Sequence, residues 1–332
     1  MSNNISERFF YHSFPRRGAS AAGEIDKGCK ILAAIRDFGL LLTPQLIEWS
    51  QPSLGGTPPR NLPTFQKRVC FTELSPRELG GHAEKFGHFS LEFDIEVVRR
   101  LGAVPVFYVP QPSGTARDGS AIGTALLAIA LDARAVIHRM SSLDKILHGP
   151  APVMENFGFN PGFAGSPDGV GHFTLNRDEA KNFLAAIGHA VTPWQDFHAG
   201  IDALMNFFHP TDNQKTDKAM DYYREREWRI ACAFRIHNTD GTHVDVMHVP
   251  EQEERRRFLE IDQEFFSREI STGIETAATL DQSLVLPGLN GTSIIDMVRR
   301  VIVPAEATTE ASDLLSGLSN PPPIVPLEEL NS

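Results

Sequence analysis

Residues 67–93 read KRVCFTELSPRELGGHAEKFGHFSLEF and carry the signals for a strand, a short helix and a second strand. The helix starts at Ser75, a residue type that caps helices. Pro76 suits the first helical turn, and Glu78 completes a capping box. Gly87 stops the helix. We therefore expect two strands connected by one helix at the centre of the fold.

The second of these strands, residues 88–93, alternates between apolar and polar residues. The apolar residues Phe89, Leu91 and Phe93 fall on one face, and His88, Ser90 and Glu92 fall on the other. Since successive side chains of a strand point to opposite faces, the pattern predicts a half-buried strand with a polar face. We expect His88 and Ser90 to be exposed to solvent, with a place in a binding site as the alternative.

Other segments extend this framework on both sides. Residues 8–14, RFFYHSF, predict a strand, and residues 25–37 predict a helix because apolar residues recur at helical spacing. WRIACAFRI at 228–236 and HVDVMHV at 243–249 predict strands joined across Asp240-Gly241, a hairpin signal.

The fold class that follows is α+β, a twisted, mostly antiparallel sheet with flanking helices and a helical insertion. Strands that alternate with helices would also permit a parallel α/β sheet, but the hairpin near the C-terminal end has no crossover helix. The expected parts are the N-terminal part of the core (1–112), the helical insertion (113–213), the C-terminal part of the core (214–318) and a Pro-rich tail (319–332).

Composition limits the classes of function. The chain has 332 residues, 41% of them hydrophobic, which is enough for a substantial core. Its net charge of -11 argues against a protein that coats nucleic acid by phosphate attraction. A local basic groove stays open as the alternative, and small molecules or proteins are the partners that the composition favours.

The cysteines and the apolar runs indicate a cytoplasmic protein. Cys29, Cys70 and Cys232 lie far apart, so neither a disulfide framework nor a zinc motif is expected. The first residues lack a signal-peptide apolar region, and Asp132 and Arg134 interrupt the longest apolar run. We therefore expect no export and no membrane span.

Common catalytic motifs are absent from the sequence. It contains no Gly-rich phosphate loop, no G-x-G-x-x-G, no G-x-S-x-G and no H-E-x-x-H. His237, His243 and His248 surround one hairpin. We expect them to be solvated hairpin residues, with a metal site as the alternative.

The segment YYREREWRIACAF, residues 222–234, passes from dense charge to a strand-like apolar run. Glu225 and Glu227 are two residues apart, so on a strand both carboxylates point to one face and could bind one ligand together. The alternative is a surface ion-pair ladder with the neighbouring arginines, Arg224, Arg226 and Arg229. The apolar residues that alternate with the second half of the segment would hold the strand rigid.

Three other polar residues have simple structural interpretations. His12 stands near the end of a strand, where a core or edge histidine is the common case. Cys70 fits a small buried apolar residue, because nothing near it in sequence would activate its thiol. His82 falls on an apolar helix face and fits a packing histidine.

Two blocks, VCFTELSPRELGGHAEKFGHFSLEFDIEVVRRLGAVPVFYVP at 69–110 and YYREREWRI at 222–230, carry motifs in a recognisable order. They resemble the AbiGi-type abortive-infection family of bacterial phage-defence proteins, with its C-F strand end, K-[FY]-G turn and E-R-E-W-R. Ser90 departs from the family, which often has glycine there. The resemblance implies an anti-phage effector whose partners include a phage or host protein or an antitoxin.

The N-terminal segment adds a second resemblance. A strand that ends near His12, followed by the helix KILAAIRDFGLL, is similar to the opening of ADP-ribosyltransferase-like folds. This resemblance implies NAD as the substrate, Glu227 as the catalytic residue with help from Glu225, and His12 as a contact to the nucleotide's ribose. An aromatic or hydroxyl residue on a middle strand would shape the nicotinamide pocket: Phe71, Thr72, Phe89 or Ser90.

The chemistry that the resemblance implies suits a fixed carboxylate. Breaking the nicotinamide–ribose bond develops an oxocarbenium-like charge, which a carboxylate stabilises. Arg229 on the same strand face would keep that carboxylate ionised or bind pyrophosphate. These features do not separate a transferase from an NAD glycohydrolase. The rival hypothesis is a non-catalytic sensor or protein-interaction module of a defence or toxin–antitoxin system.

Overall fold

The computed structural model describes residues 8–15, 21–51, 60–109, 156–159, 173–191, 207–210, 226–231, 235–237, 243–271 and 276–331, with isolated positions between 133 and 147. The chain forms two compact units. One combines Met1–Thr124 with Asn206–Ser332, and the other is Ala125–Met205. The larger unit is a mixed α+β structure with a mostly antiparallel sheet, which confirms these two parts of the predicted fold class.

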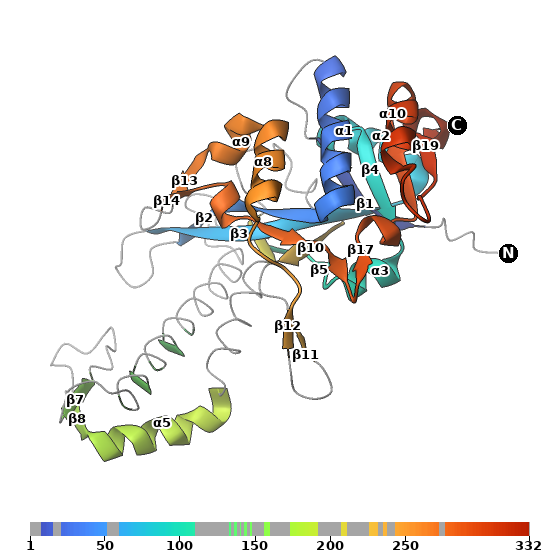
Figure 1. Cartoon of the computed structure of the whole chain (residues 1–332). Helices are drawn as coiled ribbons and strands as arrows, with labels where there is room; N and C mark the ends of the chain where they lie inside the picture. The colour runs from blue at the N-terminus through green and yellow to red at the C-terminus, as the bar shows by residue number, and fades with distance from the viewer. Residues whose placement is uncertain are drawn as a thin grey trace. The chain divides into compact units, whose positions relative to one another are not determined.

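The larger unit contains most of the described helices and strands (Figure 1). Its N-terminal part holds β1 (Phe9–Phe14), α1 (Ala21–Phe38), β2 (Leu40–Gln51), β3 (Arg60–Leu74), α2 (Leu79–Phe86), β4 (Phe89–Phe93), α3 (Ile95–Arg100), β5 (Val104–Pro105) and β6 (Phe107–Val109). Its C-terminal part holds β9 (Phe208–Pro210), β10 (Glu227–Ala231), β11 (Arg235–His237), β12 (His243–Asp245), α8 (Gln252–Ile261), α9 (Gln263–Ser267), β13 (Glu269–Ser271), β14 (Thr276–Ala278), β15 (Leu284–Leu286), β16 (Gly288–Leu289), β17 (Thr292–Ser293), β18 (Arg300–Val303), α10 (Thr308–Leu315) and β19 (Ile324–Pro326).

The smaller unit contains a hairpin and a helix among its described residues. Strands β7 (Asn156–Phe159) and β8 (Phe173–Asn176) pair antiparallel, and α5 (Arg177–Val191) follows them directly. The helix turns Ala180 and Leu184 inward, where they pack with Leu147.

The main sheet has the strand order β15-β2-β3-β1-β4-β18-β19, with β10 paired to β3 and β5 paired to β10. Every pairing within it is antiparallel except that of β18 with β19. Helix α1 covers one face through Cys29, Leu32 and Ile35, as its helical spacing predicts. On the other face, Leu79 and Ala83 of α2 pack on β1.

Strand β3 has different neighbours along its length. On one edge β10 pairs with it from Arg68 to Thr72. On the other edge β2 pairs with it only as far as Arg68, and β1 pairs with it only from Thr72 onward. The first residues of β2 pair with β15 instead. The sheet is therefore split beside residues 69–71, where neither β1 nor β2 continues the ladder.

The signals around Ser75 are confirmed. The Ser75 backbone N–H donates to Glu78 Oε2 over 2.8 Å, completing the capping box. Gly87 ends α2 with a φ of +117°, and a Cβ built there would lie 2.2 Å from the Pro15 carbonyl oxygen. Glycine is thus required both by the backbone conformation and by the close approach of the chain.

The predicted polar face of 88–93 is wrong in one respect: the strand is buried on both faces. Ser90 and Glu92 are fully buried, and Ser90 Oγ shares a 2.8 Å hydrogen bond with Ser13 Oγ. The reason is that β4 lies between β1 and β18 in the sheet and is covered on both sides. Alternation alone cannot show that a second layer covers the polar face.

The C-terminal region also differs from its pattern in detail. The predicted hairpin is confirmed in β11 and β12, but β10 is a separate strand that pairs with β3. In the segment expected to be a Pro-rich tail, β19 adds a strand beside β18, and Leu327 joins the core. No helix among the described residues is long and apolar enough to cross a membrane.

Candidate functional site

Glu227 stands at the start of β10 on a polar face of the sheet. It lies opposite Thr72 of β3, and Arg229 lies opposite Cys70. Residues directly opposite one another in a sheet share a face, so these four side chains project to the same side. The intervening Trp228 packs against the hydrophobic core, as the alternation predicted.

The Glu227 carboxylate forms a bidentate ion pair with Arg229. Arg229 Nε donates to Oε1 over 2.8 Å, and Nη2 donates to Oε2 over 2.9 Å. The Tyr108 hydroxyl of β6 donates to Oε2 over 3.2 Å. The Arg229 side chain is 1% exposed, while the Glu227 side chain keeps 12% of its surface exposed. The carboxylate is thus held by a buried cation at the edge of a buried cluster.

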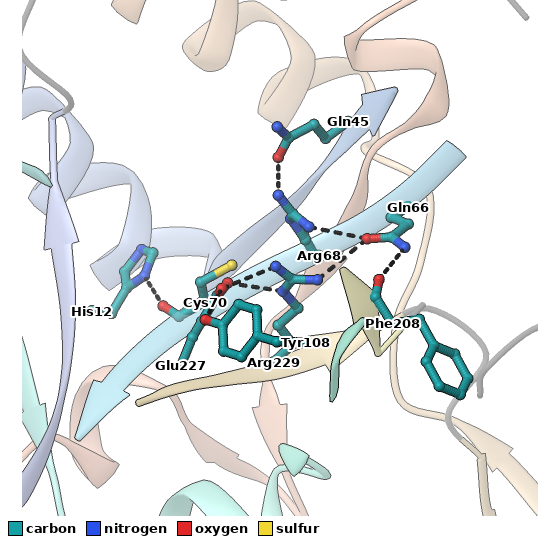
Figure 2. Close-up of polar contacts among 9 residues, drawn as sticks. All are labelled: His12, Gln45, Gln66, Arg68, Cys70, Tyr108, Phe208, Glu227 and Arg229. Carbon is teal, nitrogen blue, oxygen red and sulfur yellow. Dashed lines mark hydrogen bonds and ion pairs between the residues drawn. The ribbon is translucent and has the colours of Figure 1, made fainter. Parts of the chain in front are cut away.

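A hydrogen-bond network extends from this pair into the sheet (Figure 2). Gln66 Oε1 accepts from Arg229 Nη1 over 3.3 Å and from Arg68 Nη1 over 3.0 Å. Arg68 Nη2 also donates to Gln45 Oε1. Gln66 Nε2 donates to the Phe208 carbonyl over 3.0 Å. Residues from β2, β3, β6, β9 and β10 therefore meet in one polar cluster.

The charges of the cluster control the protonation of its members. Burial alone would raise the pKa of Glu227, but the charge and hydrogen bonds of Arg229, with Arg68 and Cys70, lower it to about 2. Burial and the Glu227 charge raise the pKa of Cys70 to about 11. Burial and the two arginines lower the pKa of His209 to about 3. At neutral pH the cluster therefore holds a carboxylate anion, a protonated thiol and a neutral imidazole.

His12 lies on the opposite face of the sheet from Glu227. Tyr11 is paired with Thr72, so the alternation of β1 turns the next residue, His12, toward the face of Phe71. Its Nδ1–H donates to the Cys70 carbonyl over 2.9 Å, because a carbonyl can only accept. His12 thus caps a backbone carbonyl at the split beside β3.

The remaining predicted residues are distributed between the cluster and the core. Thr72 lies on the Glu227 face and is buried. Phe71 and Phe89 are core residues, and Ser90 is bonded to Ser13. Glu225 lies outside the described residues. The structure therefore brings Glu227, Arg229 and Thr72 together, and it does not bring His12, Phe71, Phe89 or Ser90 to them.

The predicted surface ladder of charges needs correction, since Arg229 pairs with Glu227 inside the protein. Arg226 has a different partner, since its Nη2 donates to Glu78 Oε1 over 2.7 Å. This division follows from its φ of +43°, which breaks the strand just before β10. Arg224 lies outside the described residues.

Sequence reasoning missed five side chains of the cluster: Gln66, Arg68, Tyr108, His209 and Gln45. A signal for the first two exists, because FQKRVCFT places a polar or small residue at every second position from Gln66 to Thr72. No local pattern marks Tyr108 or His209, which come together through the parallel pairing of β6 with β9.

Within the part of the chain that the structure describes, no group of three or more His, Cys, Asp or Glu residues could hold a metal ion. His237 pairs with His243 across the hairpin, and His248 Nε2 contacts Glu254 Oε1 at 2.9 Å. Comparison of the chain with protein-family models, with curated proteins and with solved structures gave no match.

Proposed function

We propose that this protein is a bacterial anti-phage abortive-infection effector that acts on NAD, as an ADP-ribosyltransferase-like enzyme or an NAD glycohydrolase. The phage-defence part of the proposal depends on the sequence resemblance at 69–110 and 222–230. The chemical part depends on one observation: the Glu227 carboxylate is ionised, rigidly held by Arg229 and partly exposed.

A carboxylate in this state suits cleavage of the nicotinamide–ribose bond. It remains an anion across the physiological pH range, so it can stabilise the oxocarbenium-like charge of the transition state. Its orientation is set before substrate arrives, because Arg229 and Tyr108 hold it from two strands. In the proposed site, Thr72 and Tyr108 lie beside Glu227, and His12 has a structural role at the split in the sheet instead of contacting the nucleotide.

The test is nicotinamide release from NAD by the purified full chain, with and without cell lysate as a source of acceptors. Glu227→Gln keeps the shape of the side chain and removes its charge, and we expect it to lower release at least about 100-fold. Glu269→Gln is the matched control, since Glu269 is an exposed residue of β13. Absence of NAD consumption by the unsubstituted protein in every condition would rule out the enzymatic proposal.

The defence role has a separate test in cells. Phage plating efficiency is measured on bacteria that express the unsubstituted chain, Glu227→Gln or Glu269→Gln. We expect the unsubstituted chain and Glu269→Gln to protect the cells, and Glu227→Gln not to protect them. Equal protection by all three proteins would show that defence does not depend on the chemistry of Glu227.

A second candidate is a non-catalytic sensor or interaction module. Two observations favour it: both Glu227 oxygens already accept hydrogen bonds, and His12 lies on the other face of the sheet. Calorimetric titration with NAD distinguishes the two candidates. Binding without turnover, unchanged by Glu227→Gln, would support the sensor.

A further inference from the structure

We propose that Gln66 is a positioning residue that holds Arg229, and through it the Glu227 carboxylate, in a fixed orientation relative to β9. The proposal rests on the proposed function, in which Glu227 acts on the substrate. In this role Gln66 acts through Arg229 and not directly on the substrate. Its amide contacts Arg229 and Arg68 at the oxygen and the Phe208 carbonyl at the nitrogen.

The chemistry of the glutamine side chain fits this place closely. The amide oxygen faces two guanidinium groups, which can only donate, and the amide nitrogen faces a carbonyl, which can only accept. Gln66 is fully buried, so both ends of the amide must be satisfied within the protein. Glutamate could not donate to Phe208, and methionine could neither donate strongly nor accept from two arginines.

Gln66 completes the restraint on the Arg229 guanidinium. Glu227 occupies Nε and Nη2, and Gln66 occupies Nη1. Contacts at three nitrogens of a planar group determine the orientation of its plane. Without the third contact, the guanidinium and the carboxylate could turn together about their side-chain torsions.

The contacts also form a closed ring. From Glu227 the ring passes through Arg229 and Gln66 to the Phe208 carbonyl on β9. Strand β9 pairs with β6, and Tyr108 of β6 returns to Glu227 Oε2. The carboxylate is therefore held from both sides (Figure 2). The pairing of β6 with β9 ties the two sides together.

The test compares Gln66→Met with Gln45→Met. Gln45 and Gln66 are directly paired across β2 and β3, and both amides accept from Arg68. Of the two amides, Gln66 is the one that bonds to Arg229 and to the Phe208 carbonyl in the network described above. The pair of variants thus separates the loss of a polar contact to Arg68 from the loss of the Arg229 restraint.

The first readout needs no activity: a carbon-13 NMR titration of the Glu227 carboxyl, assigned by its loss in Glu227→Gln. Among the residues that the structure describes, the charged and titratable groups that face Glu227 are Arg229 on β10, Arg68 and Cys70 on β3, Tyr108 on β6 and His209 on β9. In Gln66→Met the burial of Glu227 persists while Arg229 is held less well. We therefore expect the pKa of Glu227 to rise from about 2, and to rise much less in Gln45→Met.

The second readout is steady-state NAD turnover. Since Gln66 orients a group that acts in the transition state, we expect Gln66→Met to lower kcat by about tenfold or more with little change in KM. If Gln66→Met fails to fold, Gln66→Glu replaces it. That variant cannot donate to Phe208 and competes with Glu227 for Arg229, so the pKa of Glu227 should again rise.

The outcomes separate the two proposals. An unchanged Glu227 titration in the Gln66 variants, or equal shifts in the Gln66 and Gln45 variants, would overturn the positioning role. If the unsubstituted chain shows no NAD turnover, the proposed function falls, and the titration alone decides whether Gln66 positions the ion pair.

Discussion

Glu92 provides the sharpest test of how the central sheet is held together. Its carboxylate is fully buried in β4 and accepts four contacts. Arg300 donates Nε to Oε1 over 2.7 Å and Nη2 to Oε2 over 2.6 Å. The Tyr11 hydroxyl donates to Oε2 over 2.8 Å, and Arg299 Nε lies 3.3 Å from Oε1. We consider the substitution Glu92→Gln, which preserves the volume of the side chain.

The expected cost follows from the hydrogen bonds at Oε2. The new amide can keep its oxygen toward Arg300 Nε, but its NH2 group would then face two donors, Arg300 Nη2 and the Tyr11 hydroxyl. Two hydrogen bonds to a charged group are lost, each worth about 1.5 kcal/mol or more. The Arg300 side chain is 26% exposed, so water recovers part of the loss. We expect the free energy of unfolding to fall by about 3 kcal/mol, in the range for a broken buried ion pair.

The assay is equilibrium urea unfolding of the full chain, followed by tryptophan fluorescence. For a unit of this size, with an m value of about 3 kcal/mol per molar urea, the midpoint should fall by about 1 M. Tyr11→Phe removes a single donor and should cost about half as much. Because both lost contacts share Oε2, the double variant should cost little more than Glu92→Gln alone. A loss below about 1 kcal/mol for Glu92→Gln, or strict additivity of the two changes, would refute this account.

Three further predictions follow from the same structure. Gly87→Ala should lower the free energy of unfolding by about 2 kcal/mol or more, because Gly87 has a positive φ and lies close to Pro15. Gly81 lies on α2 with open space around it, so Gly81→Ala should raise the free energy of unfolding by up to about 1 kcal/mol in the same urea assay. The pKa of Glu227, about 2, lies below its ordinary 4.5, so this group stabilises the fold above pH 4.5 and loses that effect as the pH falls toward 2. Glu227→Gln should therefore weaken the dependence of the thermal midpoint on pH between 4.5 and 2. A pH series of thermal midpoints with an unchanged slope in this variant would contradict the prediction. Burial, with the charge of Lys85, lowers the pKa of His82 from 6.5 to about 4, so the stability present above pH 6.5 should decline as the pH falls toward 4. His82→Phe can keep the stacking on Phe86 and should remove that part of the decline.

Local signals in the sequence predicted the elements well. The capping box at Ser75, the helix stop at Gly87 and the spacing of Cys29, Leu32 and Ile35 all act within one or two helical turns. Such signals depend on backbone conformation and on hydrogen bonds between near neighbours, which the amino-acid types alone determine. The same is true of the alternation that turns Trp228 to the core and Glu227 to the other face.

The tertiary structure alone decided what lies next to these elements. The order of the strands places β4 inside the sheet, so Ser90 and Glu92 are buried where alternation suggested solvent. The register of β10 on β3 brings Arg229 to Gln66, 163 positions away in the chain, and the pairing of β6 with β9 brings in Tyr108. The split beside β3 assigns His12 to a backbone carbonyl instead of to Glu227. These outcomes depend on which strands pair and in which register, and that choice is made by burial of the whole core, to which residues from every part of the chain contribute.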